Sequence, residues 1–381
     1  MITREKIYLD AENLFLLALD LFLIAEIMDH TYFPMPSEIN NTMKLISVLL
    51  VIIKILWDFK LKENYISLSS FIILTIFISI SILSALNIRN DQPIITAILI
   101  MGARKVDFIK ILKHFAVVAS FCLLITFIAY FLGIANSPVL VRDGVIRYTF
   151  GYKWPTDLAE LITFILMSEL YICMHRKKRL SFRIPIYIIV GLFSYYVINA
   201  RLASTAIFVL IPLSLFYKSK IFQKSKLVKS ILVLFMPICV LLSIFLVTLY
   251  TRFPKSIFLV NLDNLLSYRL YLEVTGVKLY GYTIFGQNIV DDYIVRFHNS
   301  WFYIDSSYYI FLLEYGIALL IFLCMIYIVF VKRCLQIQEH ILAIMLSISC
   351  IIGLVAQVWY LPEYNIFLLS FFSIIENKLK I

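Results

Sequence analysis

The sequence predicts an all-α, polytopic membrane protein, and three observations carry this prediction. The chain has 381 residues, of which 62% are hydrophobic and only 15% are charged, whereas soluble domains are about half apolar and about a quarter charged. Long apolar runs recur along the whole chain, and Lys and Arg gather in alternate connections between them, which is typical of cytoplasmic loops. Because backbone groups in lipid must be hydrogen-bonded within helices, the runs are expected to form a transmembrane helix bundle.

The apolar runs predict about twelve spans in a single integral membrane domain that covers residues 1–381. A helix needs roughly 20 apolar residues to cross a bilayer. The expected spans cover residues 11–28, 43–57, 65–86, 92–103, 114–135, 157–174, 184–200, 202–217, 229–250, 306–331, 340–357 and 364–376. The second, fourth and twelfth are short, and they are the ones expected to be half-spans or tilted pieces inside the bundle.

The charge distribution predicts that both termini are cytoplasmic. With a cytoplasmic N-terminus, 22 of the 34 Lys and Arg residues fall in cytoplasmic segments and 10 in outer segments. The opposite orientation would reverse this positive-inside bias. The formal net charge of +10 is therefore a topology signal, and no nucleic-acid partner is expected.

The longest segment between apolar runs is a large extracytoplasmic loop, residues 251–305, between the ninth and tenth expected spans. Counted up to Gly316, this stretch carries five basic residues, several acids and many aromatics. A polytopic protein that keeps one large polar loop on one face is expected to work there.

Basic residues on the outer face are few, and Arg201 is the most informative. It stands between the seventh and eighth expected spans with almost no loop around it. An Arg at this depth is costly unless it is paired or binds an anion, so Arg201 is a candidate site residue. The alternative is an Arg that snorkels to lipid phosphates or pairs with a loop acid.

A cluster of outer arginines suits a lipid-linked phosphate, because guanidinium is permanently charged and binds phosphate oxygens in a bidentate manner. An enzyme on this face lacks cytoplasmic ATP, and a polyprenyl diphosphate-linked sugar would arrive already activated. Arginines would stabilise the charge on the departing diphosphate, and a carboxylate or imidazole would take the proton from the incoming hydroxyl. His298 is the one histidine in the large loop. The acidic alternatives are Glu273, Asp291, Asp292, Asp305 and Glu314.

No metal and no cofactor are predicted. The six cysteines form no Cys-x-x-Cys pair and none lies in the large loop, so neither a zinc site nor a disulfide framework is expected. The Asp291-Asp292 pair lacks further ligands at a fixed spacing.

Two acids within expected spans are interpreted as structural. Asp20 lies near the middle of the first span, where it is expected to bond to a neighbouring helix, with a proton relay as the alternative. Glu169 lies seven residues before the basic run Arg176–Arg183 and is expected to pair there.

Several short elements follow one another from about residue 95 to the end of the chain. They are Met101–Phe108, Arg147–Thr156, Arg201 with Ser204, Ser267–Arg269 followed by Phe285-Gly286, and Asp305–Tyr308 followed by Tyr315-Gly316. Their order resembles the bacterial polymerases of O-antigen and capsular polysaccharide repeat units, which are relatives of the O-antigen ligases. The second element is similar to the Arg-x-x-x-Gly-Phe-x-His-Pro-Asn element of that family, with Trp154 and Thr156 in place of the His and the Asn.

The resemblance implies a metal-independent, inverting glycosyl transfer at the outer face of a bacterial plasma membrane. A growing glycan would leave one polyprenyl diphosphate and join the sugar of another lipid-linked repeat unit, to build a capsule, an O-antigen or an exopolysaccharide. Arg147, Arg201 and Arg269 would bind the diphosphate, and a chain-length regulator and a flippase would be partners.

Two alternatives stay open. One is a ligase that transfers the glycan to a different acceptor. The other is not an enzyme but a flippase for lipid-linked oligosaccharides. A transporter would usually show two related halves, and the sequence shows no such repeat.

Overall fold

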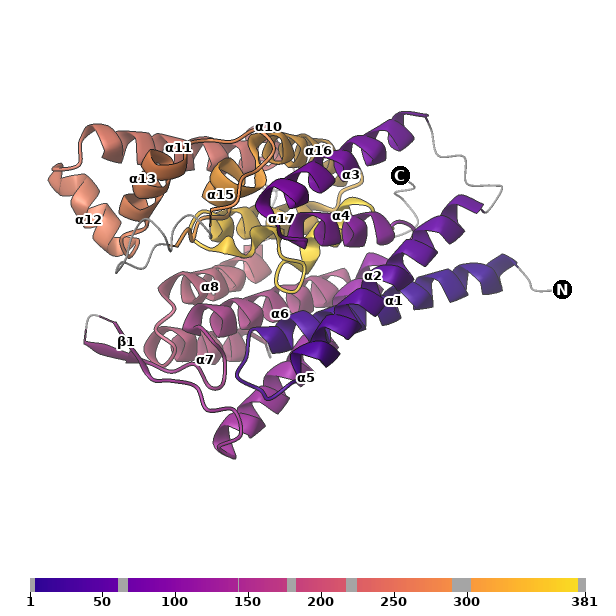
Figure 1. The fold of residues 1–381 in the computed structure, drawn as a ribbon, viewed down its shortest axis with the longest axis horizontal. Coiled ribbons are helices and arrows are strands. Elements are labelled where there is room, and N and C mark those ends of the chain that lie inside the picture. Colours follow the sequence, from indigo (N-terminus) through magenta and orange to yellow (C-terminus); the bar gives the residue numbers. More distant parts are fainter. Residues whose placement is uncertain are drawn as a thin grey trace. The chain divides into compact units, whose positions relative to one another are not determined.

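The computed structural model describes residues 4–60, 68–142, 144–176, 183–216, 225–289 and 303–375, and most of them are helical (Figure 1). The chain divides into two compact units. Unit 1 comprises Met1–Tyr65, Ile98–Gln223 and Pro362–Ile381, and unit 2 comprises Ile66–Ala97 and Lys224–Leu361. Each unit therefore combines segments that are far apart in the sequence. The boundary at residues 97 and 98 falls within α4 (Gln92–Gly102).

Unit 1 is built from long helices and one short hairpin. Its elements are α1 (Arg4–Asp29), α2 (Ser37–Lys60), α5 (Phe108–Phe131), β1 (Leu140–Arg142), β2 (Val145–Arg147), α6 (Pro155–His175), α7 (Arg183–Tyr196), α8 (Arg201–Phe216) and the 3-10 helix η3 (Ile366–Phe371). Helix α1 packs against α2 and α5, α5 packs against α6, and α8 packs against both α6 and α7. The strands β1 and β2 are antiparallel, with Leu140 opposite Arg147.

Polar contacts join the helices of unit 1. Asp20 of α1 lies 3.0 Å from Nδ1 of His114 on α5, which is the bond to a neighbouring helix that the sequence interpretation expects. Glu169 of α6 lies 3.6 Å from the Nε of Arg183, within the basic run where it was expected to pair.

Lys54 of α2 binds backbone carbonyl groups at the C-terminal end of α4. Its side chain is buried, and its ammonium donates to the carbonyl oxygens of Gly102, at 2.7 Å, and Arg104. It also lies 2.8 Å from the carboxylate of Asp58. The last carbonyls of a helix have no partner within the helix and attract cations, so these contacts compensate the burial of the charge.

The segment after residue 361 returns to unit 1. Ile374 donates to the carbonyl of Val106 at 2.8 Å and accepts from the N–H of Phe108 at 3.0 Å. The ring of Phe367 meets that of Phe108 with centroids 5.9 Å apart. This late segment therefore packs against helices that precede it by more than 200 residues.

Unit 2 contains the long helix α16 and the elements that pack around it. Its elements are α3 (Leu68–Ile88), α10 (Lys226–Val233), α11 (Phe235–Arg252), α12 (Ile257–Leu265), α13 (Arg269–Tyr280), α15 (Ser307–Ile310), the π-helix η1 (Phe311–Tyr315), α16 (Ile317–Gln336), α17 (His340–Gly353) and the 3-10 helix η2 (Gln357–Tyr360). Helix α16 packs against α3, α10, α11 and α17, and α13 packs against α11.

Six helices among the described residues are long and apolar enough to cross a membrane, so the expectation of about twelve spans is wrong. They are Ser37–Asp58, Phe71–Ile88, Phe108–Phe131, Pro155–His175, Phe235–Arg252 and Ile317–Gln336. The expected spans at 184–200 and 340–357 are helices of 14 residues, which measure only about 21 Å. The expected span at 364–376 contains the 3-10 helix η3 in place of an α-helix.

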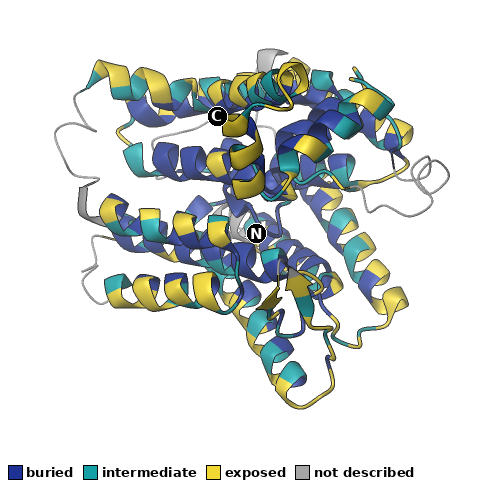
Figure 2. Ribbon diagram, turned by 90° about the vertical axis from the view of Figure 1, so that its left-hand side faces the viewer, coloured by how far each residue is buried: buried dark blue, intermediate teal, exposed yellow. Residues whose placement is uncertain are grey.

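Many helices have exposed residues along one face and buried residues along the other (Figure 2). Many of the exposed side chains are large and apolar. Leu56 on α2 is 63% exposed, Leu86 on α3 is 70% exposed and Phe131 on α5 is 73% exposed. Such faces are expected to contact lipid. The helices are therefore those of a multi-pass membrane protein.

Candidate functional site

The predicted site residues are divided between the two units. Arg147 and Arg201 belong to unit 1, whereas Arg269, Glu273 and Asp305 belong to unit 2. His298, Asp291 and Asp292 lie outside the described residues.

A tight corner between α12 and α13 sets the position of Arg269. Ser267 and Tyr268 both adopt left-handed backbone conformations, with φ of 66° and 64°, which are uncommon for residues other than glycine. Asp263 on α12 accepts from the backbone N–H of Leu270, at 2.9 Å, and of Tyr271, at 3.3 Å. These N–H groups at the start of α13 would otherwise lack partners. The corner thus fixes Arg269 as the first residue of α13.

Three of the predicted site residues lie close together in unit 2. The Nε of Arg269 donates to Oδ2 of Asp305 at 2.7 Å, and both side chains are largely covered. A guanidinium has five N–H donors, and this bond uses one of them. Glu273 lies one turn along α13 and is buried. Burial raises the pKa of Glu273 well above its ordinary value, against the opposing charge of Arg269.

The raised pKa of Glu273 predicts a pH dependence of stability. Above the ordinary glutamate pKa of 4.5, the folded chain still holds a proton that the unfolded chain has released. The free energy of unfolding is therefore expected to fall as pH rises from about 4.5 through the raised pKa. Glu273→Gln should remove this decline, so the variant should gain stability relative to the wild type as pH rises.

The measurement is the difference in melting temperature between the detergent-solubilised variant and the wild type from pH 4.5 to 9. A difference that stays constant over this range would mean that Glu273 titrates alike in both states.

Two glycines allow the segment that follows α13 to pack closely against the backbone at the start of α16. Gly286 has φ of 98° and Gly316 has φ of 104°. A Cβ on Gly316 would lie 2.5 Å from the carbonyl oxygen of Ile284, and one on Gly286 would lie 2.7 Å from that of Glu314. The carbonyl oxygens of Thr283 and Ile284 accept from the first N–H groups of α16. The Phe-Gly and Tyr-Gly elements of the sequence therefore form one backbone junction.

The residues after Asp305 anchor the segment to the helices of unit 2. The Ser307 hydroxyl donates to the carbonyl of Ala356 and accepts from the N–H of Trp359 at 3.1 Å. The Tyr308 hydroxyl donates to the carbonyl of Cys350 at 2.8 Å. Both side chains are buried. The Asp-Ser-Ser-Tyr element thus fixes Asp305 beside Arg269.

The two unit 1 arginines lie on neighbouring chain segments. Arg147 ends β2, and the N–H of the next residue, Tyr148, meets the carbonyl of Val197 at 3.4 Å. Val197 leads into Arg201, which begins α8 and is exposed. The hydroxyl of Ser204 donates to the carbonyl of Gly191 at 2.9 Å and joins α8 to α7.

A second group of ionisable residues, which the sequence interpretation missed, lies in unit 1. It comprises Glu26, His30, Lys44, Asp157 and Glu363. Burial alone would lower the pKa of His30, but the surrounding carboxylates, first that of Asp157, raise it above its ordinary value. Burial, and then the charge of Glu26, raise the pKa of Glu363. No local motif marks this group, because its members come from four separate segments of the sequence.

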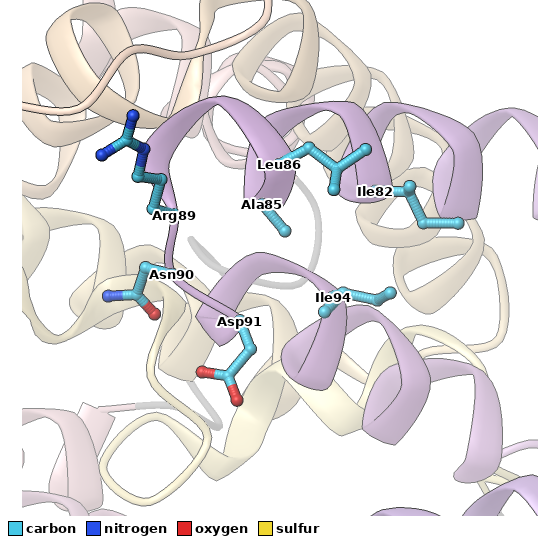
Figure 3. A pocket seen from close by; sticks show the side chains of 7 residues that line it. All are labelled: Ile82, Ala85, Leu86, Arg89, Asn90, Asp91 and Ile94. Carbon is cyan, nitrogen blue, oxygen red and sulfur yellow. The ribbon is translucent and has the colours of Figure 1, made fainter.

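A groove of about 560 Å³ lies between α3 and α4 in unit 2 (Figure 3). Ile82, Ala85, Leu86 and Ile94 form its apolar part, and Arg89, Asn90 and Asp91 lie at one end. An apolar groove with a polar end suits an amphipathic molecule such as a lipid.

Comparison with protein-family models, with curated proteins and with solved structures finds no match for this chain.

Proposed function

We propose that the chain is a polymerase that joins polyprenyl diphosphate-linked oligosaccharide repeat units on the outer face of a bacterial plasma membrane. The donor glycan leaves its diphosphate and forms a bond to a sugar hydroxyl of the next lipid-linked unit. The product is a capsule, an O-antigen or an exopolysaccharide.

The observation that carries the proposal is the group formed by Arg269, Asp305 and Glu273. Among the described residues, Arg269 is held by one hydrogen bond, to Asp305 at 2.7 Å, which leaves guanidinium donors for a second anion. A diphosphate oxygen suits these donors, and a positive charge at this point stabilises the departing diphosphate. Glu273 and Asp305 supply carboxyl groups within the same group of side chains, and burial raises the pKa of Glu273 well above its ordinary value.

Three further features support a lipid-linked anionic substrate. Arg147 and Arg201 lie on adjoining segments of unit 1. The groove between α3 and α4 offers an apolar channel with an arginine at one end. Apolar helices would place such residues next to lipid. In this proposal Arg269 binds the diphosphate, the apolar helices and the groove receive the polyprenyl chain, and no metal takes part in the transfer.

Deletion of the gene tests the proposal against its alternatives. The lipid-linked glycans are extracted from the deletion strain and their length and membrane side are determined. A polymerase mutant is expected to accumulate single repeat units on the outer face. A flippase mutant would hold them on the cytoplasmic face, and a ligase mutant would accumulate long chains still bound to the lipid. Long surface glycan of normal amount in the deletion strain would contradict all three functions.

A further inference from the structure

Three side chains of unit 1 bring potential metal ligands together. Glu26 lies in the last turn of α1, His30 directly follows that helix, and Glu363 lies in the segment between η2 and η3. One ligand atom from each lies within 4.8 Å of the other two. Glu26 and Glu363 are buried, whereas the His30 side chain is 29% exposed.

The surroundings of His30 orient its imidazole ring toward Glu363. Nδ1 faces Oδ2 of Asp157 at 3.4 Å, and Nε2 faces Oε1 of Glu363 at 4.0 Å. The edge of the ring meets Tyr364, with ring centroids 5.4 Å apart. An imidazole that faces a carboxylate with one nitrogen and turns the other toward further ligands resembles the arrangement found around protein-bound metals.

Three buried acids of this group share one lysine and one histidine. The acids Glu26, Asp157 and Glu363 are all buried. Lys44 lies 3.0 Å from Oε2 of Glu26 and neutralises one of them. Oε2 of Glu363 is buried and accepts no hydrogen bond from any described residue. A buried carboxylate oxygen without a partner is costly, and a bound cation would supply the missing partner.

We propose that Glu26, His30 and Glu363 bind one divalent transition-metal ion, and that Asp157 orients His30 for this role. One imidazole nitrogen with two carboxylate oxygens favours Zn²⁺ or Mn²⁺ over Mg²⁺ and Ca²⁺, which prefer oxygen ligands alone. Metal–ligand bonds of about 2.1 Å place ligand atoms about 3–4 Å apart, so the side chains need to close by about 1 Å. The exposed side of His30 gives the ion access from solvent.

The site is distinct from the Arg269 group and does not depend on the proposed function. Glu26 and His30 lie near the start of the chain and Glu363 lies near its end. A bound ion would therefore link α1 to the segment after residue 361. The sequence predicts no metal, because Glu26, His30 and Glu363 form no local motif.

Metal binding is tested on the full-length protein, purified in detergent through a tag without histidine and stripped with EDTA. Zn²⁺, Mn²⁺ or Mg²⁺ is added, bound metal is counted by mass spectrometry, and the melting temperature is followed. The wild type is expected to bind one Zn²⁺ or Mn²⁺ per chain, to melt at a higher temperature when loaded, and to respond weakly to Mg²⁺.

Four variants separate this site from other metal-binding groups. Glu363→Gln, which keeps the shape of the side chain, and His30→Ala are expected to weaken binding at least about tenfold. Asp157→Asn is expected to weaken it by about 10- to 100-fold through the orientation of His30. Lys44→Met should strengthen binding, because the ammonium no longer competes for Glu26. The matched control is Glu169→Gln, an acid of unit 1 outside the group, which should bind like the wild type.

Two outcomes overturn the proposal. In the first outcome, the wild type binds no ion and Glu363→Gln melts at the same or a higher temperature, which is the behaviour of an ion-pair network that holds a proton. In the second outcome, all variants bind the ion alike, which places it elsewhere on the chain.

Discussion

Replacing Gly316 by alanine is expected to destabilise the protein by about 3 kcal/mol or more. The backbone of Gly316, with φ of 104° and ψ of 142°, lies in a region that costs other residues about 1–3 kcal/mol. The new methyl group would also lie 2.5 Å from the carbonyl oxygen of Ile284, and overpacking of this kind costs about 1–3 kcal/mol. The clash involves backbone atoms on both sides, so rotation of a side chain cannot relieve it.

Gly281→Ala is the matched control for this prediction. Gly281 also has a positive φ, of 68°, but a Cβ there would meet no atom within 4 Å. The control should therefore cost only the backbone strain. Melting temperatures in detergent are to be compared, and equal losses in the two variants would show that the Gly286–Gly316 junction can relax around a methyl group.

Arg269→Ala is expected to reduce glycan chain extension by about 100-fold or more while the protein still accumulates in the membrane. The substitution removes the guanidinium that the proposal assigns to the departing diphosphate, and loss of one such donor costs about 10²–10³ in rate. Arg269→Lys should recover little activity, because lysine cannot form the bidentate contact. The readout is the length of surface glycan in a deletion strain that carries each variant.

Two further variants distinguish chemistry from folding. Lys278→Ala removes an exposed basic residue from the last turn of the same helix and should leave chain length unchanged. Asp305→Asn keeps a hydrogen-bond acceptor for Arg269 but removes the carboxylate, so it tests whether the ion pair itself is needed. Chains of full length with Arg269→Ala would remove Arg269 from the proposed site.

The helical class of the fold could be predicted from the sequence, whereas the number of spans could not. Hydropathy marks where apolar helices occur, but it does not show where a helix ends. The expected span at 229–250 is interrupted at Leu234, between α10 and α11. The expected span at 364–376 is as apolar as a short span, yet its described residues, 364–375, are mostly buried and include the 3-10 helix η3.

The candidate site was predicted in part. Arg269, Glu273 and Asp305 were each chosen from the large loop, and the structure brings all three together. Asp263 was missed, although its carboxylate holds the start of α13. Nothing in the local sequence separates such a residue from an ordinary loop acid, because its role depends on the left-handed turn at Ser267 and Tyr268.

The unit 1 group was missed for a different reason. His30 and Glu363 lie more than 300 residues apart in the sequence, and only the return of the chain to unit 1 places them together. Sequence patterns extend over short distances along the chain. They therefore indicate helix faces and turns more readily than contacts between segments that are distant in the sequence.

The return of residues 362–375 to unit 1 has a consequence for biosynthesis. A ribosome releases α1, α5 and α6 long before it makes this segment, so the contacts of Ile374 with Val106 and Phe108 cannot form during most of translation. Until then, the earlier helices stay in the translocon or the surrounding lipid without the contacts that this late segment provides. Nascent chains arrested before residue 362 should therefore be digested by protease more readily in the connection at residues 103–107 than the finished protein.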